Sequence, residues 1–535
     1  MSERNRGVSV LRVALALLVL GVAALHAFIY SFPFEDAFIT FRYARNLARG
    51  NGLVYNPGEI VEGYSSFAWT VLLAAVSALR LPLEASAHAL SLGFGACMLG
   101  LTAQAYARVP NDPDFRPRWP FGLGAALLLA CSGTFAFYAN TGMETTLFCA
   151  LLLSAALCLG RDAGRDETGE QPPRAFAAGL LLAAGALTRP EGVGYALVVL
   201  AAVSCVPADR PHALRAASGF ALVFVPYYAW RFLRYGHWAP NTYYAKASAS
   251  WPLLLQGVSY AESFLVGRGF LAAYCVALAL LVRVPRSSFL RIACAVLFAA
   301  VAMSVVVGGD TFAFHRFFLP AIPFAALMLV AALDGATRSG RLLPTLSAVS
   351  LVVLASCALI WSEHVPVSTL LETRTRSEYA RALSSAELDR DYFVVGRFLR
   401  EHVLPGKLLA LNAAGIVPFE SDLPTLDMLG LNDAHIAHLP IQLGRGVIGH
   451  EKHDARYVLA RKPDLILLGL PVLAPLRFGP DQIASWYARF FRALPGDAQL
   501  WRDPELLRDY APLYVRMDRG VLYALVRRDA GTVLR

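Results

Sequence analysis

Two acidic residues, Glu35 and Asp36, follow directly on a long apolar run near the N-terminus. The residues after them have the pattern of a helix, so a role for Asp36 at a helix N-terminus is one explanation. Capping would account for only one of the two acids. A carboxylate at this place could take a proton from a hydroxyl group, stabilise a developing positive charge or bind a divalent cation. We therefore expect Asp36 and Glu35 to be catalytic.

Other charged residues interrupt apolar runs in a similar way. Glu144 precedes a helix-like run, where it either stabilises the helix dipole or serves as a second acid. Arg189 is close to Glu191 in the sequence, which allows a local ion pair or a phosphate site at a helix start. Lys246 is either an interfacial anchor, as Tyr and Lys often are, or a phosphate ligand. These alternatives stay open at this point.

A third group of candidates combines turn-forming and polar residues. Glu62 and Tyr64 follow a loop rich in Gly and Asn, which is either structural or a substrate contact. An acid, an imidazole and a guanidinium occur together at residues 310–316, but no His-x-x-x-His spacing supports zinc. The loops at 427–433 and 449–454 are polar enough to form an acceptor surface, but ordinary solvated loops are expected. Phosphate binding is expected at Arg42, Arg189, Lys246 and Arg316, and substrate binding at Glu62, Tyr64, Tyr243, Asp310 and His315.

The composition is that of a polytopic membrane protein. Hydrophobic residues make up 56% of the 535 residues, charged residues only 16%, and the mean hydropathy is +0.49. The net charge of +9 comes mainly from arginines in short loops between apolar runs, so it indicates membrane orientation and not nucleic-acid binding. The eight cysteines lie in or beside apolar runs without a C-x-x-C pair, which argues against disulfides and a cysteine metal site.

Apolar runs long enough to span a bilayer predict about eleven transmembrane helices. The first is expected to be a retained anchor and not a cleaved signal peptide. A shorter apolar stretch at 65–79 is expected to be a re-entrant or juxtamembrane helix. The predicted spans are residues 8–30, 84–107, 119–138, 144–160, 174–188, 191–206, 213–233, 259–282, 289–307, 317–334 and 343–361.

The positive-inside rule predicts the orientation. Arg4 and Arg6 put the N-terminus in the cytoplasm, and the arginine-rich loops share that side only if residues 65–79 do not cross. The outer loop 31–64 and the C-terminus then lie outside the membrane. This partition gathers most of the candidate residues on one face, namely Glu35, Asp36, Glu144, Arg189, Lys246, Asp310, His315 and Arg316.

Residues 363–535 have a mixed polar and apolar composition. Short apolar runs at 408–411 and 463–468 predict buried strands, and 391–402 predicts a helix, as expected for an α/β domain. The fold class predicted is thus an all-α polytopic membrane bundle, residues 1–362, followed by an extracytoplasmic α/β domain, residues 363–535.

These pieces suit a lipid-linked donor whose head group is a sugar phosphate. Its tail needs a groove between spans, its phosphate needs cations at the membrane face, and its sugar carbon needs a nearby carboxylate. The chain has no G-x-x-x-x-G-K loop for a nucleotide phosphate. Transfer of a sugar from a polyprenyl phosphate is therefore a coherent hypothesis.

Several short motifs, taken together, resemble those of one enzyme family. The outer-loop strings at 35–44, 50–56 and 61–64 are similar to the first outer loop of GT-C-fold, polyprenyl-phosphate-sugar-dependent glycosyltransferases, and more narrowly of the mycobacterial terminal arabinofuranosyltransferases and their bacterial relatives. Further strings recur in the same order at 142–145, 187–192, 308–310 and 429–433. One difference is that the relatives often have Asp-Asp where this chain has Glu35-Asp36, which favours Asp36 as the catalytic acid.

The resemblance implies a polyprenyl-phosphate pentose donor, an active site on the periplasmic face of the plasma membrane, and a catalytic Asp36 with Glu144 from the second outer loop. Transfer of an arabinofuranosyl residue to a cell-envelope glycan or a pilin-like glycoprotein is the leading hypothesis. One alternative keeps the fold but uses mannose or aminoarabinose, and another is a non-catalytic transporter of lipid-linked glycans. A divalent cation bound by Asp36 and Glu144 is the only cofactor considered.

Overall fold

The structure is a computed structural model of the chain. The described residues form two compact units. The helical unit comprises Met1–Ser31, Ala87–Trp230 and Gly257–Arg381, and the mixed unit comprises Phe32–Ser86, Arg231–Gln256 and Ala382–Arg535. The structure describes all residues except 1–2, 110–118, 161–173, 249, 286, 338–341, 370–375, 471–472, 480–481, 483–484 and 487–493.

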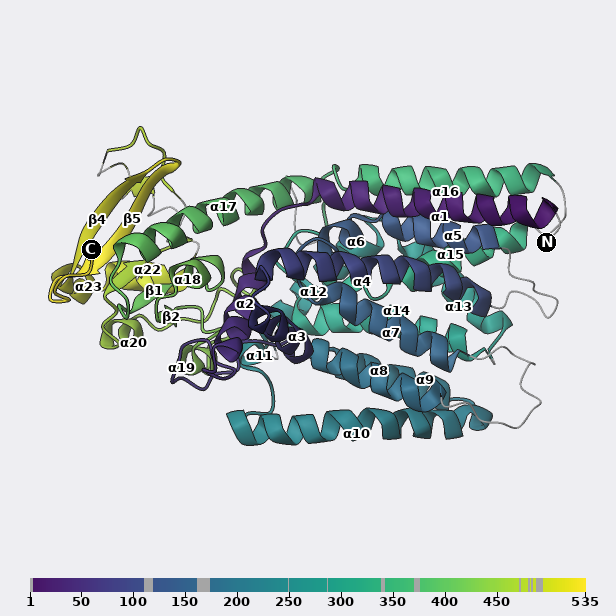
Figure 1. The fold of residues 1–535 in the computed structure, drawn as a ribbon, viewed down its shortest axis with the longest axis horizontal. Coiled ribbons are helices and arrows are strands. Elements are labelled where there is room, and N and C mark those ends of the chain that lie inside the picture. The colour runs from purple at the N-terminus through teal and green to yellow at the C-terminus, as the bar shows by residue number, and fades with distance from the viewer. Residues whose placement is uncertain are drawn as a thin grey trace. The chain divides into compact units, whose positions relative to one another are not determined.

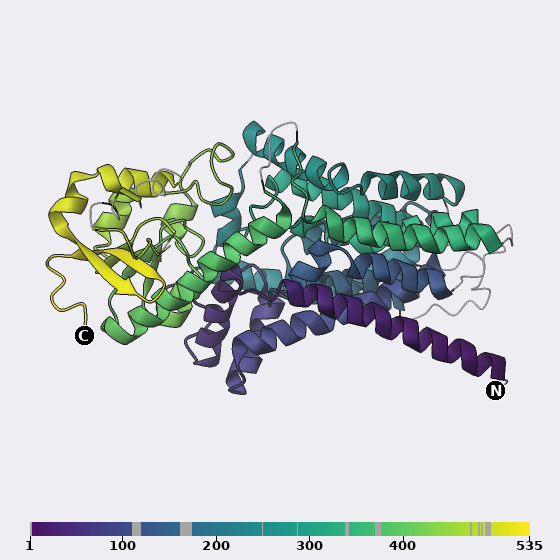
Figure 2. The same cartoon turned by 90° about the horizontal axis from the view of Figure 1, so that it is seen from above.

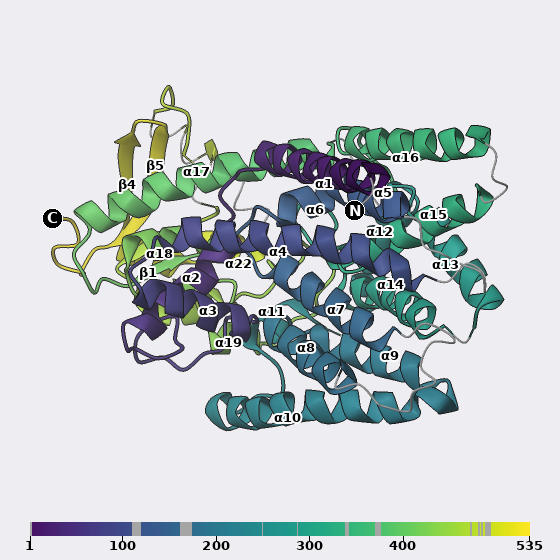
Figure 3. The same cartoon turned by 45° about the vertical axis from the view of Figure 1, so that its right-hand side comes forward.

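The helical unit is built from apolar helices of different lengths (Figure 1). Helix α7 packs against α8 and α14, α9 packs against α8 and α14, and α5 contacts α1, α15 and α16. Figure 3 shows α7, α8 and α9 side by side from a second direction. The helices that lie wholly or partly in this unit are α1 Glu3–Ile29, α4 Leu83–Ala105, α5 Trp119–Ala130, α6 Gly133–Tyr138, α7 Thr145–Leu159, α8 Arg174–Thr188, α9 Gly192–Ser204, α10 Arg210–Tyr235, α12 Trp251–Leu265, α13 Leu271–Arg283, α14 Ser288–Val307, α15 Ile322–Ala336 and α16 Leu342–Ser362.

Local sequence signals fix the ends of helix α14. The Ser287 side chain accepts a hydrogen bond from the backbone N–H of Leu290, so it caps the helix N-terminus. The helix ends at Gly308, whose φ of 85° is readily adopted only by glycine. The expected span at 289–307 therefore coincides with a capped helix.

Two glycines allow helices α8 and α10 to approach closely. A Cβ atom on Gly179 of α8 would lie 1.9 Å from the carbonyl oxygen of Ala216, and one on Gly219 of α10 would lie 2.4 Å from that of Phe176. Small residues at helix contacts are typical of helices that pack inside a bilayer. The contact has no room for a side chain at either glycine.

Two of the expected spans are interrupted. Residues 119–138 form α5 and α6, which are separated at Cys131 and Ser132, and residues 259–282 include the break between α12 and α13. The second break contains Gly269, with a φ of 75°, so the chain leaves the helical conformation there. The other expected spans each contain a helix, and residues 65–79 form helix α3, Phe67–Ala78.

Three described helices are long and apolar enough to cross a membrane by length and composition: Ser9–Ile29, Leu83–Arg108 and Ser288–Val307. Eight shorter apolar helices accompany them within the described residues. The count of eleven crossings stays a prediction. Several arginines used for the orientation lie outside the described residues, namely Arg116, Arg118, Arg161, Arg165, Arg286, Arg338 and Arg341.

The mixed unit contains a five-stranded sheet with the order β2-β1-β3-β5-β4. Strand β1 is parallel to β2 and β3, whereas β5 is antiparallel to β3 and β4. The β4–β5 hairpin is the yellow pair of arrows in Figure 2. The strands are β1 Leu409–Leu411, β2 Thr425–Asp427, β3 Leu465–Leu467, β4 Tyr510–Met517 and β5 Gly520–Arg527.

Adjacent strands and flanking helices share one apolar core. Ala410, Ile466 and Leu525 come from β1, β3 and β5, and they pack with Val458 and Leu500 from two flanking helices. The strands expected at 408–411 and 463–468 and the helix expected at 391–402 are all present. The helices of the mixed unit are α2 Glu35–Ala48, α3, α11 Asn241–Lys246, most of α17 Glu378–His402, α18 Ile416–Ser421, α19 Ala434–Ala437, α20 Ala455–Ala460, α22 Pro495–Arg502 and α23 Pro504–Asp509.

Residues 32–86 and 231–256 belong to the same unit as the C-terminal region. The sequence predicts a boundary at residue 362 between a membrane region and a region outside the bilayer. Packing within the chain does not test that division, and it stays a prediction.

Candidate active site

The Glu35 carboxylate is used to hold two helices together. It accepts hydrogen bonds from the backbone N–H groups of Gly415, at 2.6 Å, and Ile416, at 2.8 Å. These groups start helix α18, whose first N–H groups have no partner within the helix. Burial raises the pKa of Glu35 to about 7, although both N–H donors oppose that rise. Glu35 therefore fixes the first turn of α2 on α18.

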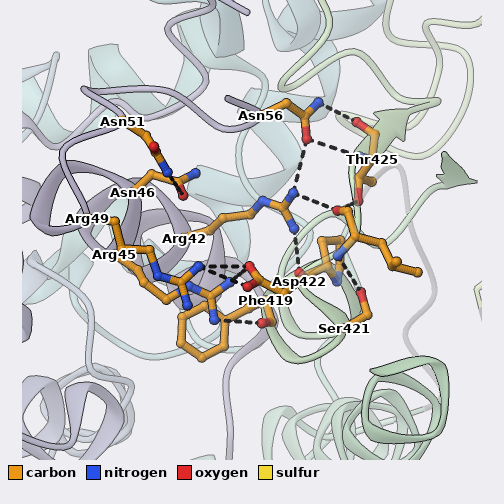
Figure 4. A network of polar contacts seen from close by, with 12 residues as sticks. Arg42, Arg45, Asn46, Arg49, Asn51, Asn56, Phe419, Ser421, Asp422 and Thr425 are labelled. Atoms are coloured by element: carbon orange, nitrogen blue, oxygen red, sulfur yellow. Dashed lines mark hydrogen bonds and ion pairs between the residues drawn. The ribbon is translucent and has the colours of Figure 1, made fainter. Parts of the chain in front are cut away.

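Arginines at the C-terminal end of α2 and just after it bind the other end of the same short helix (Figure 4). Arg45 donates to the carbonyl oxygen of Phe419, at 2.9 Å, and to the Asp422 carboxylate, at 2.8 Å. Arg49 also binds Asp422, at 2.9 Å. An acid at the start of α18 and cations at its end both complement the helix dipole. Helix α2 is thus attached to α18 along most of its length.

Arg42, predicted to bind a phosphate, has its guanidinium in contact with protein acceptors. Its buried guanidinium donates to the carbonyl oxygens of Tyr55, at 2.9 Å, and Leu423, at 2.7 Å, and to Asn56 Oδ1, at 3.0 Å, with a further bond to the Pro418 carbonyl. Figure 4 shows this guanidinium among its protein acceptors. With its donors occupied in this way, Arg42 stabilises the fold.

Asp36 differs from Glu35 in having a free carboxylate. Its side chain is half-buried and has no hydrogen bond or ion pair with any residue that the structure describes. It does not cap α2, because the N-cap residue is Phe34 and no side chain bonds there. Its charge acts on Glu35 and on the buried Asp389 of α17, and burial raises the pKa of Asp389 well above its ordinary value. Asp36 is the acid of the pair that is available for chemistry.

Lys246 and His450 belong to the same unit as Asp36. Lys246 is the last residue of α11, is half-buried and has no ion pair within the described part of the chain. A Cβ atom on Gly449 would lie 3.2 Å from Lys246 Cε, so the backbone of the 449–450 loop lies against the lysine side chain. The charges of Asp36 and Lys246 both act on His450. We call Asp36, Lys246 and His450 the acid–lysine cluster.

The expectation of solvated loops at 427–433 and 449–454 is wrong. All residues from 427 to 433 are buried, and so are Glu451 and Lys452. Asp427 accepts hydrogen bonds from the N–H groups of Leu429 and Asn432 and from the Asn432 amide. Polar groups that form hydrogen bonds with one another can be buried. The hydrophobicity of the sequence does not reveal such pairs.

Glu62 and Tyr64, expected to bind substrate, are instead buried in the fold. Glu62 forms a bidentate ion pair with Arg231, with N–O distances of 2.9 and 2.6 Å. The hydroxyl groups of Tyr64 and Tyr235 lie 3.1 Å apart. Only Tyr243 among the expected substrate ligands of the mixed unit is well exposed, at 57%.

In the helical unit, Glu144 and Arg189 bind each other. Arg189 Nη1 lies 2.8 Å from Glu144 Oε1, and Arg189 Nε lies 2.5 Å from Glu191 Oε1. All three side chains are largely shielded from solvent. The local ion pair that the sequence left open for Arg189 is present, and a phosphate site at this helix start stays a prediction. Its guanidinium is already compensated by two carboxylates.

The expected cluster at residues 310–316 also forms internal contacts. Arg316 Nη2 lies 2.8 Å from Asp310 Oδ2, and His315 Nε2 lies 3.0 Å from Ser263 Oγ. Arg316 is close enough to Arg189 for their charges to interact. The helical unit therefore brings Glu144, Arg189, Asp310 and Arg316 into one charged region.

Among the described residues, no group of three or more His, Cys, Asp or Glu side chains is arranged to hold a metal ion. Asp36 and Glu144, which we considered as cation ligands, belong to different units. The eight cysteines are all free thiols, as expected. A requirement for a divalent cation stays a prediction.

Comparisons with known proteins bear on both the sequence and the fold. Residues 379–516 match a family model described as a domain of unknown function, DUF8728. A terminal beta-(1->2)-arabinofuranosyltransferase of Mycobacterium tuberculosis is 32% identical over 247 residues. That match takes in 43% of this chain and 37% of the relative, so most of the relative's length is not matched.

Solved structures resemble almost the whole chain. ArnT from Cupriavidus metallidurans, bound to undecaprenyl phosphate, has a TM-score of 0.57 at 13% identity, covering 98% of each chain. The oligosaccharyltransferase AglB from Archaeoglobus fulgidus, in complex with an inhibitory peptide and a dolichol-phosphate, has a TM-score of 0.53 at 12% identity, covering 97% of this chain and 74% of that one. The fold implied by the motif resemblance is thus confirmed in three dimensions, and the chain has the GT-C fold.

Proposed function

We propose that the protein is an integral-membrane glycosyltransferase that uses a polyprenyl-phosphate sugar as donor. Two observations from relatives support this: ArnT is bound to undecaprenyl phosphate, and AglB is in complex with a dolichol-phosphate. The name of the mycobacterial relative favours an arabinofuranosyl residue as the transferred sugar. A cell-envelope glycan or a pilin-like glycoprotein is the acceptor that we propose.

The observation that carries the proposal is that one unit holds a carboxylate, Asp36, and an ammonium, Lys246, that have no ion pair within the described residues and whose charges both act on His450. In sugar transfer, the bond between the anomeric carbon and the phosphate oxygen breaks, and the lipid phosphate leaves as an anion. A cation such as Lys246 stabilises the charge that develops on this leaving group. A carboxylate such as Asp36 acts in one of two ways: as the base that takes the proton of the acceptor hydroxyl while its oxygen bonds the anomeric carbon, or as the nucleophile that bonds this carbon first and is then displaced by the acceptor.

The helical unit has a charged region of its own. Arg189 and Arg316 carry positive charge near one another, but each is paired with carboxylates. Binding of an anion there would require exchange of these pairs, so we assign the donor phosphate to Lys246 first. Glu144 then acts through Arg189 as a positioning residue. Asp310 and His315 shape the surrounding region, where His315 is held by Ser263.

We place the protein in the plasma membrane, with the N-terminus in the cytoplasm and residues 363–535 on the periplasmic side. The arginine distribution supports this orientation. Single cysteines introduced at exposed residues such as Arg397 and Arg508 can be labelled with a thiol reagent that does not cross membranes. We expect labelling in intact spheroplasts, and protection of both positions would contradict the orientation.

A panel of lipid-linked sugars tests the function. Purified protein should transfer arabinofuranose from synthetic polyprenyl-phosphoryl-arabinose to an arabinan oligosaccharide. Activity with only a mannose or aminoarabinose donor would keep the enzyme class but replace the sugar. Loss of activity on chelation, restored by Mg²⁺ or Mn²⁺, would establish the divalent cation. Absence of transfer from every polyprenyl-phosphate sugar would contradict the proposal.

A further inference from the structure

His450 of the acid–lysine cluster lies in a loop that its own hydrogen bonds hold in place. The Glu451 carboxylate accepts hydrogen bonds from three successive N–H groups, those of Gly444, Arg445 and Gly446, at distances of 2.6 to 3.0 Å. These bonds close the loop on itself. A carboxylate with this many donors orders the backbone around it. The loop is thus an ordered part of the fold.

The same loop is seated directly on the segment that follows Lys246. Ser250 Oγ donates to the carbonyl oxygen of Leu443, at 2.7 Å. A Cβ atom on Gly444 would lie 2.4 Å from the backbone nitrogen of Leu253, so only glycine fits there. Gly449, with a φ of 77°, makes the close approach to Lys246. Contacts at both ends of the loop therefore fix His450 relative to Lys246.

The tautomer of His450 follows from its hydrogen bond. Nδ1 lies 3.0 Å from the carbonyl oxygen of Ile448, which can only accept, so Nδ1 carries the proton. In the neutral ring Nε2 then has a free lone pair, and it has no hydrogen bond to any described residue. Burial and the Lys246 ammonium lower the pKa of His450, against the Asp36 and Glu451 carboxylates, which raise it. The imidazole is therefore neutral at pH 7.

We infer that His450 Nε2 accepts a hydrogen bond from a ring hydroxyl of the donor sugar. The inference rests on the proposed function. In that function Lys246 faces the phosphate and Asp36 faces the anomeric carbon. The Gly449 backbone, which precedes His450, packs against Lys246, so His450 lies on the donor's side of the site. The free lone pair of a neutral imidazole accepts a hydrogen bond, so it can bind a sugar hydroxyl group. It cannot bind a phosphate oxygen, because that oxygen is itself a hydrogen-bond acceptor. His450 would thus help to select and orient the sugar.

Two substitutions separate this role from a purely structural one. His450→Asn keeps an N–H for the Ile448 carbonyl but has no atom at the position of Nε2. His450→Gln can place an amide oxygen near that position. We expect His450→Asn to lower kcat/KM for the donor by about 10- to 100-fold, the effect of one lost hydrogen bond in a buried site, and His450→Gln to restore part of it.

Deoxy donors provide the decisive comparison. Removal of the hydroxyl that binds His450 should slow the wild-type enzyme but have little further effect on His450→Asn. His453→Asn is the matched control, because its Nδ1 also bonds a backbone carbonyl, that of Glu451, at 2.8 Å in the same loop. The control variant should discriminate among deoxy donors as the wild type does.

The outcomes distinguish the inference from the proposed function. If the wild type transfers sugar but His450→Asn keeps the full preference of the wild type for every hydroxyl, the inference is wrong and the function stands. An equal loss of discrimination in His453→Asn would also overturn it, because the effect would then belong to the loop and not to Nε2. If the wild type transfers no lipid-linked sugar, both are overturned.

Discussion

The Glu35 carboxylate accepts a hydrogen bond from the backbone N–H of Gly415 at 2.6 Å, across 380 residues of sequence. A second bond to the N–H of Ile416 occupies its other oxygen. The neighbouring acid, Asp36, has no such partner among the described residues. Two adjacent carboxylates thus have different roles, one in holding helix α2 in place and the other in the proposed chemistry.

Removal of the Glu35 carboxylate should destabilise the protein. Glu35→Ala leaves the N–H groups of Gly415 and Ile416 without acceptors, which costs about 1–3 kcal/mol for each buried group. Thermal unfolding in detergent, followed by intrinsic fluorescence, should show a lower Tm. Asp36→Asn is the control and should unfold close to the wild type. Equal Tm values for Glu35→Ala and the wild type would contradict the structural role.

Stability should depend on pH through buried carboxyl groups of the mixed unit. Burial raises the pKa of Glu35 to about 7, and those of Asp427 and Asp497 to about 6, from ordinary values of 4.5, 3.8 and 3.8. An acid whose pKa is raised in the folded state stabilises the fold when the pH is below its ordinary pKa. This contribution is lost as the pH rises through 6 to 7.

The pH effect is measured by denaturant unfolding between pH 5 and 8. We expect the free energy of unfolding to fall as the pH rises across this window. Asp497→Asn should reduce the slope, because an amide does not titrate. An increase in stability with pH over the same range would show that these carboxylates are not protonated in the fold.

The Glu62–Arg231 ion pair should be strongly coupled. Removing one partner of a buried pair costs about 3–5 kcal/mol, because the other charge is left uncompensated. We expect Glu62→Gln and Arg231→Met each to lower stability, and the double variant to lose less than the sum of the two. A double-mutant cycle on unfolding free energies measures this coupling, and additive losses would argue that the charges do not interact.

Close packing of α8 and α10 should be sensitive to a single methyl group. Gly179→Ala would place its Cβ 1.9 Å from the Ala216 carbonyl oxygen, so the helices must separate. We expect a lower Tm by several degrees, consistent with about 1–3 kcal/mol for overpacking. Gly185→Ala in the same helix is the control, since its Cβ would make an ordinary contact of 3.6 Å with Phe148. Identical Tm values for the two variants would contradict the close approach.

The sequence predicted the helices and the α/β character of the C-terminal region well. Apolar runs and caps, such as Ser287 at the start of α14, act locally and can be recognised from neighbouring residues. The breaks within 119–138 and 259–282 were missed, because the apolar run continues through them. Gly269 was the available signal for the second break, since glycine readily adopts the positive φ found there.

The candidate site could be predicted only in part. Asp36 was favoured over Glu35 from motif resemblance, whereas the contact that separates them joins residues far apart in the chain. The pairing of Glu62 with Arg231 spans 169 residues and is equally invisible in one sequence. His450 was overlooked, because only the loop around it, ordered by Glu451, distinguishes it from a histidine in solvent.

The central claim is that Asp36 carries the chemistry, and Asp36→Asn tests it most directly. The substitution keeps the size of the side chain and removes its charge. Purified variant and wild type should be compared in transfer from polyprenyl-phosphoryl-arabinose, with donor binding and Tm measured in parallel. We predict a loss of turnover of about 10²- to 10⁴-fold with the fold and donor binding retained. A folded, donor-binding Asp36→Asn with wild-type turnover would contradict the account.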